Sequence, residues 1–155
     1  MEYRMATDTD IEMLMRIRLE TLRAVNGLSE NHPFSDALII HSRRYFLAGN
    51  TATALALDEG EAVACASLAY IEVMPTLSHP TGLRAHLMNV YTRPNYRRRG
   101  ISRRLIQMLI EQARQKGVTE ISLDTTDAGR PLYEALGFRA SQECMTIHLN
   151  DRYFN

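Results

Sequence analysis

The chain has 155 residues, of which 45% are hydrophobic, and its 18 basic side chains balance 18 acidic ones. This length suits one compact domain with a sizeable core, so residues 1–155 are expected to form a single domain. The neutral balance argues against nucleic acid as a partner, the longest apolar run (62–71) is too short to span a bilayer, and early acidic residues argue against a signal peptide, which favours a cytoplasmic location.

The amino-terminal third predicts a strand, two helices and a hairpin. Apolar residues recur at helical spacing after the first short strand and stop at Asn26-Gly27, and a second, less regular helix follows. Two segments rich in small and β-favouring residues flank an acidic turn. In chain order, the expected elements are a strand at 3–6, helices at 11–25 and 34–48, and hairpin strands at 51–57 and 62–74.

The second half predicts a strand, helix and strand in succession, which implies a parallel pair. A later helix is expected to begin at Asp127 or just after it, with Pro131 in its early turns and Gly137 past its end. The fold class is therefore α/β, with a mixed sheet. The remaining expected elements are a loop at 75–82, a strand at 87–92, a helix from 101 to Gly117, a strand at 118–123, and short strands at 138–140 and 145–149.

An arginine-rich turn joins the strand at 87–92 to the amphipathic helix that starts at Ile101. Proline at position 94 ends the strand, and the first backbone N–H groups of the helix have no intrahelical partner. The positive end of the helix dipole and four arginines, Arg97, Arg98, Arg99 and Arg103, favour an anion there. The turn is thus predicted to bind phosphate oxygens.

The run Asn89-Val-Tyr-Thr-Arg-Pro-Asn-Tyr-Arg-Arg-Arg-Gly-Ile-Ser102, taken with Leu132-Tyr-Glu-Ala-Leu-Gly-Phe138, resembles the GNAT superfamily of acetyl-CoA-dependent N-acyltransferases. The resemblance covers residues 3–149 as an order of elements and is specific over about 88–104 and 126–138. It implies the GNAT fold, in which two central strands splay apart and admit the pantetheine arm like an extra strand.

The resemblance also implies coenzyme contacts. The family's pyrophosphate loop falls on Arg97, Gly100 and Ser102, where serine replaces the usual glycine or alanine and must turn its hydroxyl aside or donate it to a phosphate. Backbone groups near Val90 and Thr92 correspond to those that pair with pantetheine and polarise the thioester carbonyl. The implied coenzyme-binding residues are Val90, Tyr91, Thr92, Arg97, Arg98, Arg99, Gly100, Ile101, Ser102, Thr126 and Arg130.

Two catalytic residues are expected from the same resemblance. Tyr133 matches the tyrosine that lies beside the sulfur, where a phenol can protonate the departing thiolate. His86 occupies the place where the histone-acetylating branch carries its general-base glutamate, and imidazole titrates near pH 6.5. Glu72, Asp124 and a water chain are rivals for the base, because an aliphatic amine must lose a proton before it attacks.

The implied function is an N-acetyltransferase that transfers acetyl from acetyl-CoA directly to a primary amine in a ternary complex. A catalytically idle acyl-CoA sensor is the alternative, and a nucleotide-dependent phosphotransferase is disfavoured because G-x-x-x-x-G-K-[ST] is absent. The acceptor is expected over residues 20–35 and 72–84, where Glu30 and Glu72 are available to attract a cation. A small amine and a peptide amino terminus both suit it.

Neither a metal site nor a disulfide is predicted. Cys65 and Cys144 lie outside any C-x-x-C pattern and are expected to be buried small residues. The expected partners are acetyl-CoA and an amine, with no nucleic acid and no membrane, and a homodimer is common among the proteins that the chain resembles.

Overall fold

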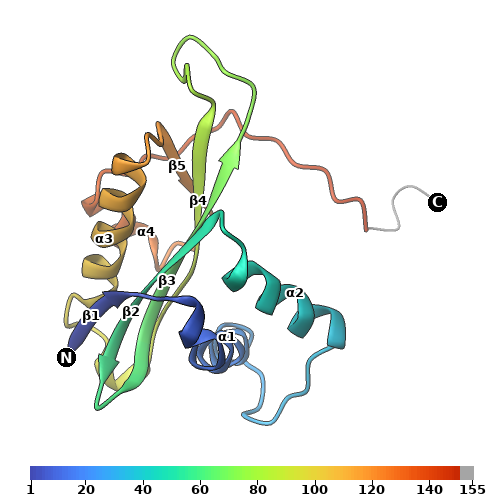
Figure 1. The fold of residues 1–155 in the computed structure, drawn as a ribbon, viewed down its shortest axis with the longest axis vertical. Helices are drawn as coiled ribbons and strands as arrows, with labels where there is room; N and C mark the ends of the chain where they lie inside the picture. Colours follow the sequence, from blue (N-terminus) through green and yellow to red (C-terminus); the bar gives the residue numbers. More distant parts are fainter. Residues whose placement is uncertain (151–155) are drawn as a thin grey trace. The chain divides into compact units, whose positions relative to one another are not determined.

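The computed structural model describes residues 1–150 and divides them into two compact units, the first ending at Asp124 and the second starting at Thr125. Figure 1 shows the fold. The expected single domain stays a prediction. No helix within residues 1–150 is long and apolar enough to cross a membrane.

The first unit is built on a five-stranded mixed sheet, which confirms the predicted α/β class. The strands lie in chain order; the first three neighbouring pairs are antiparallel, and β4 and β5 are parallel. Glu59 and Gly60 form the two-residue turn between β2 and β3, and both have the positive φ that tight hairpin turns favour. The strands are β1 (Glu2–Met5), β2 (Thr51–Asp58), β3 (Glu61–Glu72), β4 (Leu83–Thr92) and β5 (Glu120–Leu123).

Three α-helices cover this sheet. Figure 1 shows α1 (Ile11–Val25) and α2 (Asp36–Leu47) on one face and α3 (Ile101–Gln115) on the other. Coverage of both faces explains why β3 is buried almost continuously instead of alternating. The helix α3 packs an apolar stripe at the predicted spacing on the sheet: Ile101, Leu105, Ile106, Leu109 and Ala113.

The observed boundaries correct the sequence expectation mainly in β4, which begins at Leu83, four residues before the predicted start. Its first residues, Leu83 to His86, pair with β3, and the β5 partners of Arg84 to Leu87 begin at Glu120. The loop predicted at 75–82 is observed between β3 and β4 and spans residues 73–82. Cross-strand pairing therefore decided the start of β4, since its local sequence carries a charged arginine and a histidine.

Residues 125–150 of the second unit contain one helix, α4 (Arg130–Ala135). Pro131 lies in its first turn and Gly137 lies past its end, as predicted, and Gly137 has a left-handed φ. The helix starts three residues after Asp127. The strands predicted at 138–140 and 145–149 are wrong: residues 138–150 form none. The alternating apolar side chains in this segment stay exposed. Such a pattern forms a strand only when the segment can pair with another strand.

Candidate active site

The turn between β4 and α3 presents unpaired backbone donors. A 3-10 turn, η2 (Pro94–Tyr96), leads into residues 97–100, where Arg98 and Gly100 both have left-handed φ values, 65° and 73°. The N–H groups of Arg98, Arg99 and Gly100 donate no hydrogen bond within residues 1–150. Successive N–H groups in such a turn form a concave anion-binding nest, and the start of α3 adds its own unpaired donors.

Side chains hold this turn in shape and add positive charge. Arg97 Nε donates to the Thr92 carbonyl at 3.0 Å, and Arg99 Nη2 donates to the Asn95 carbonyl at 2.8 Å while its guanidinium lies over the Tyr96 ring. Arg98 makes no ion pair or hydrogen bond within the described residues. The turn thus carries arginine charge that no carboxylate in this part of the chain neutralises, as an anion site requires.

The Ser102 hydroxyl lies 2.7 Å from Thr92 Oγ1 and is hydrogen-bonded to it. Of the two orientations that the sequence allowed, this one turns the hydroxyl toward β4 and away from the unpaired donors. A serine at this place therefore leaves the backbone approach to the turn open and ties the first turn of α3 to the end of β4.

The edge of β4 is open next to this turn. Parallel pairing with β5 stops at Leu87 and Leu123, whereas β4 continues to Thr92. Its pairing with β3 also shifts between Cys65 and Ser67, opposite Asn89, which has φ 58°. Asparagine tolerates this left-handed conformation, so a β-bulge forms at Asn89 and redirects the backbone of Val90.

Hydrogen bonds on both sides secure the Asn89 side chain. Its Oδ1 accepts from Arg18 Nη1 at 3.0 Å, and its Nδ2 donates to Ser67 Oγ at 3.3 Å. Ser67 in turn shares a hydrogen bond of 2.8 Å with Thr53. The buried Cys65 thiol donates a hydrogen bond to the Asn89 carbonyl at 3.3 Å. Burial raises the pKa of this thiol to about 12. The bulge is therefore a fixed feature of the sheet.

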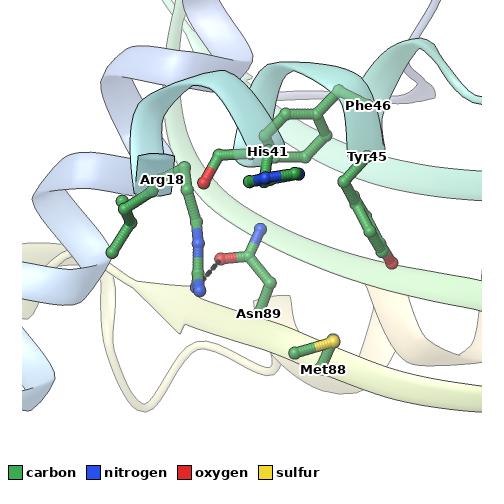
Figure 2. A pocket seen from close by; sticks show the side chains of 8 residues that line it. Arg18, His41, Tyr45, Phe46, Met88 and Asn89 are labelled. Atoms are coloured by element: carbon green, nitrogen blue, oxygen red, sulfur yellow. Dashed lines mark hydrogen bonds between the residues drawn. The ribbon is translucent and has the colours of Figure 1, made fainter. Parts of the chain in front are cut away.

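A cavity of about 270 Å³ lies over the bulge, between α1, α2 and β4. Figure 2 shows Arg18 from α1, His41 and Tyr45 from α2, and Asn89 from β4 gathered around it, with the hydrogen bond between Arg18 and Asn89 dashed. Glu30 and Glu72, which the sequence suggested for the acceptor, do not line this cavity. Its lining residues are Arg18, Leu38, His41, Ser42, Tyr45, Phe46, Met88 and Asn89.

His86 lies on the cavity side of the sheet. Met88 lines the cavity, and side chains two residues apart on a regular strand point to the same face; both residues precede the bulge. Its Nδ1 is hydrogen-bonded to Ser122 Oγ at 2.8 Å, and its Nε2 lies 3.7 Å from Asp124 Oδ2. The structure thus joins two of the candidate bases, His86 and Asp124, into one pair.

Glu72 lies on the opposite face of the sheet. Tyr70 pairs with Ala85 and donates to Gln112 of α3, so this register places Tyr70, and Glu72 two residues on, toward α3. His86, one residue after Ala85, faces the other way. This alternation places Glu72 on the face away from the cavity and leaves His86, with Asp124 beside it, as the candidate on the cavity side.

The second unit carries the remaining predicted residues. Tyr133, on α4, is half-buried and packs edge-on against Phe138 at 5.9 Å, and burial raises the pKa of its phenol. Arg130 lies 4.0 Å from Glu134, while Thr126 accepts backbone hydrogen bonds at the start of the helix. An alanine in place of Gly129 would put its Cβ 2.6 Å from Thr125 Oγ1, so the Thr125 side chain would have to shift.

The sequence model of the acetyltransferase (GNAT) family matches residues 11–138, which include the open strand, the arginine-rich turn and Tyr133. The chain belongs to the GNAT acetyltransferase family. The resemblance noted in the sequence is thereby confirmed at the level of family and fold.

Relatives of this GNAT protein include solved structures of similar length. A predicted acetyltransferase from Clostridium acetobutylicum, solved with acetyl-CoA, is 27% identical, with TM-score 0.83 and 96% of each chain covered. A Trypanosoma brucei acetyltransferase is also 27% identical, with TM-score 0.70 and coverage of 96% of this chain and 99% of that one.

A curated relative matches a shorter stretch of the GNAT protein. Glucosamine 6-phosphate N-acetyltransferase of Trypanosoma brucei brucei is 39% identical over 64 residues, which is 41% of this chain. The match spans only 44% of that relative's length. Similarity of this extent supports the family and leaves the acceptor to be argued from the site.

The residues around the GNAT protein's turn suit the diphosphate and the pantetheine arm of coenzyme A. The nest at residues 98–100 offers free donors, and Gly100 leaves open space within 4 Å of where a Cβ would lie. The open edge of β4 offers backbone groups to an extended arm. Residues 1–150 contain no group of three or more His, Cys, Asp or Glu side chains that could hold a metal ion.

Sequence reasoning missed Arg18, His41 and Tyr45, which the fold brings together, and it was wrong about Cys144, which is exposed. A signal for Arg18 was present, since it falls four residues after the buried Leu14 on the inward side of α1. Asparagine inside a strand was a signal for the bulge, because asparagine is depleted in strands. The histidine and tyrosine carried no such signal.

Proposed function

We propose that the protein is an N-acetyltransferase that transfers acetyl from acetyl-CoA directly to a primary amine in a ternary complex. The observation that carries the proposal is the row of backbone donors at Arg98, Arg99 and Gly100, which find no partner within residues 1–150 and lie where the open edge of β4 ends. These donors suit a diphosphate, and the edge suits an extended arm that leads toward the cavity.

The coenzyme supplies the thioester when it is bound, and the protein's residues supply orientation and proton transfer. In the proposed reaction the amine nitrogen forms a bond to the acetyl carbon, the carbon–sulfur bond breaks, and the thiolate leaves with the bonding electrons. Backbone donors near Val90 and Thr92 are proposed to stabilise charge on the carbonyl oxygen. Binding both substrates together makes the attack effectively unimolecular.

The ammonium form of the acceptor loses one proton to become a nucleophile and a second after the bond to carbon forms, while the sulfur gains one. His86 is proposed as the base that takes the amine proton, with Asp124 beside it to stabilise the imidazolium. Tyr133 is proposed to donate its phenolic proton to the thiolate. Burial raises the pKa of this phenol, so it stays protonated at neutral pH and serves as an acid. Arg130 and Thr126 are proposed to contact the coenzyme.

Similarity to glucosamine 6-phosphate N-acetyltransferase supports an amine on a small molecule as the acceptor class. The cavity over Asn89, at about 270 Å³, is slightly smaller than most ligand pockets, about 300–1,000 Å³, and favours a small acceptor over a folded protein segment. A cytoplasmic location and a homodimer remain predictions, and gel filtration with light scattering tests the latter.

The experiment that tests the proposal combines turnover with coenzyme binding. Thiol release from acetyl-CoA is measured against polyamines, amino acids, amino sugars, aminoglycosides and peptides, beside a calorimetric titration with CoA. Tyr133→Phe should lower kcat about 10²-fold, because it removes the acid, and leave the CoA Kd within about twofold. Tight CoA binding with no turnover on any amine would instead favour an acyl-CoA sensor, and absence of CoA binding would contradict the proposal.

A further inference from the structure

Arg18 brings a positive charge into the cavity over the bulge without an acidic partner. Its guanidinium is partly buried, and burial lowers its pKa. Within residues 1–150 it forms no ion pair, and its one side-chain hydrogen bond goes to the neutral amide oxygen of Asn89. The acidic residue two positions on, Glu20, is bound by Arg93 through two hydrogen bonds of 2.9 Å.

A cation partly removed from water without a counter-ion is costly, because burial strips some of its hydration and only the neutral Asn89 amide oxygen replaces it. Arginine also presents several N–H donors in one plane, and the single bond to Asn89 leaves others available. A planar carboxylate or a phosphate matches this arrangement and would offset the cost.

The hydroxyl of Tyr45 is a second unmet group at the same cavity. It is buried and finds no hydrogen-bond partner within the described residues. Burial raises the pKa of Tyr45 to about 12, so the hydroxyl keeps its proton at neutral pH and can donate it. A buried hydroxyl without a partner is uncommon in folded proteins and points to a ligand that completes it.

We propose that the amine acceptor carries an anionic group, a carboxylate or a phosphate, which binds in this cavity to the Arg18 guanidinium and the Tyr45 hydroxyl. The inference rests on the proposed acetyltransferase function and adds the acceptor's chemical class. Met88 and Asn89 form the floor of the cavity, and Val90 follows them directly at the open edge. An acceptor anchored by its anion in the cavity therefore reaches its amine toward that edge.

The test uses matched pairs of amines that differ only in the anionic group: lysine against cadaverine, and glucosamine 6-phosphate against glucosamine. Both initial-rate kinetics with acetyl-CoA and calorimetric binding to CoA-loaded protein are measured. The anionic member of at least one pair should have a kcat/KM or an affinity about tenfold or more above its neutral counterpart. The first pair reports a carboxylate and the second a phosphate.

Two variants connect that preference to the cavity. Arg18→Met should reduce the anionic-to-neutral ratio to about one through KM, whereas Arg16→Met, an exposed arginine of the same helix, should leave the ratio unchanged. Tyr45→Phe should lower the ratio about three- to tenfold, since only the hydroxyl is removed. CoA affinity should stay at the parent value in all three, which shows that the fold is intact.

Equal use or binding of the neutral and anionic members, or a ratio that survives Arg18→Met, overturns the inference while the acetyltransferase proposal stands. Binding of an anionic member that depends on Arg18 but is followed by no acetylation supports the anion site and counts against the proposed function. No binding and no acetylation of any member overturns the anion site.

Discussion

The turn at residues 97–102 and the cavity over Asn89 flank the same strand, yet they are built from different parts of the chain. The turn offers backbone N–H groups from consecutive residues, whose spacing follows from two left-handed residues and the start of α3. The cavity offers side chains from α1, α2 and β4, up to 71 positions apart in sequence. The first depends on local conformation, and the second depends on packing between elements.

This difference predicts how each region fails. A backbone nest is sensitive to φ and hardly to side-chain chemistry, whereas the cavity tolerates backbone changes elsewhere and depends on individual side-chain groups. Coenzyme affinity should therefore respond to the turn, and acceptor preference to the cavity, with little cross-effect. The following variants test that separation.

The largest expected effect is on coenzyme binding in Gly100→Val. Gly100 has φ 73°, and a β-branched residue held there costs about 1–3 kcal/mol, so the nest should open. Calorimetry should show CoA affinity reduced about ten- to hundredfold. Gly49→Val is the control, because Gly49 lies outside the left-handed region with open space around its Cβ position. An unchanged Kd in Gly100→Val would show that the turn does not bind the coenzyme through its backbone.

A smaller effect is expected at Asn89, where the two regions meet. Alanine adopts the left-handed φ of 58° less readily than asparagine, and Asn89→Ala also removes the hydrogen bonds to Arg18 and Ser67. The free energy of unfolding should therefore fall by about 2 kcal/mol. Asn89→Gly keeps the bulge and loses only the side chain, so its loss should be about 1 kcal/mol. Urea unfolding measures both.

The pair also separates backbone from side chain in function. Asn89→Gly should keep the parent CoA affinity and lower the preference for anionic acceptors, because Arg18 loses the bond that orients it. A glycine variant that loses coenzyme binding and acceptor preference together would show that the two regions are not separate.

The smallest effect lies away from both regions, at the start of α1. Hydrogen bonds from Arg4, at 2.7 and 2.8 Å, and from the Thr7 N–H lower the pKa of Asp10 from 3.8 to about 2. A carboxylate with a lowered native pKa stabilises the fold above its unfolded pKa, and that contribution is lost as the pH falls from about 4 to 2. Asp10→Asn should cost about 1 kcal/mol at pH 7 and flatten this acid dependence.

Thermal unfolding between pH 7 and pH 2.5 measures this change, and the CoA Kd and acceptor ratio of Asp10→Asn should equal those of the parent at pH 7. An acid profile that stays as steep in Asp10→Asn would assign the loss of stability to other carboxylates.

Local sequence determined most of the architecture. Helical spacing in α1 and α3, the acidic hairpin turn and Gly137 are signals carried by neighbouring residues, and so is the anion-favouring turn at residues 97–102. The motif around Tyr133 likewise identified the family from consecutive residues. Each of these features depends on backbone φ angles, on the spacing of apolar residues or on consecutive N–H donors, and a short stretch of chain specifies all three by itself.

Only the tertiary structure decided the rest. The start of β4 followed its pairing with β3 and β5, and the alternating residues after Phe138 stayed outside any strand within the described part of the chain. The sheet register placed the side chains of Glu72 and His86 on opposite faces of the sheet. The cavity needed α1, α2 and β4 to bring Arg18, Tyr45 and Asn89 together. Such contacts join residues far apart in sequence, so their energies depend on packing that no local pattern encodes.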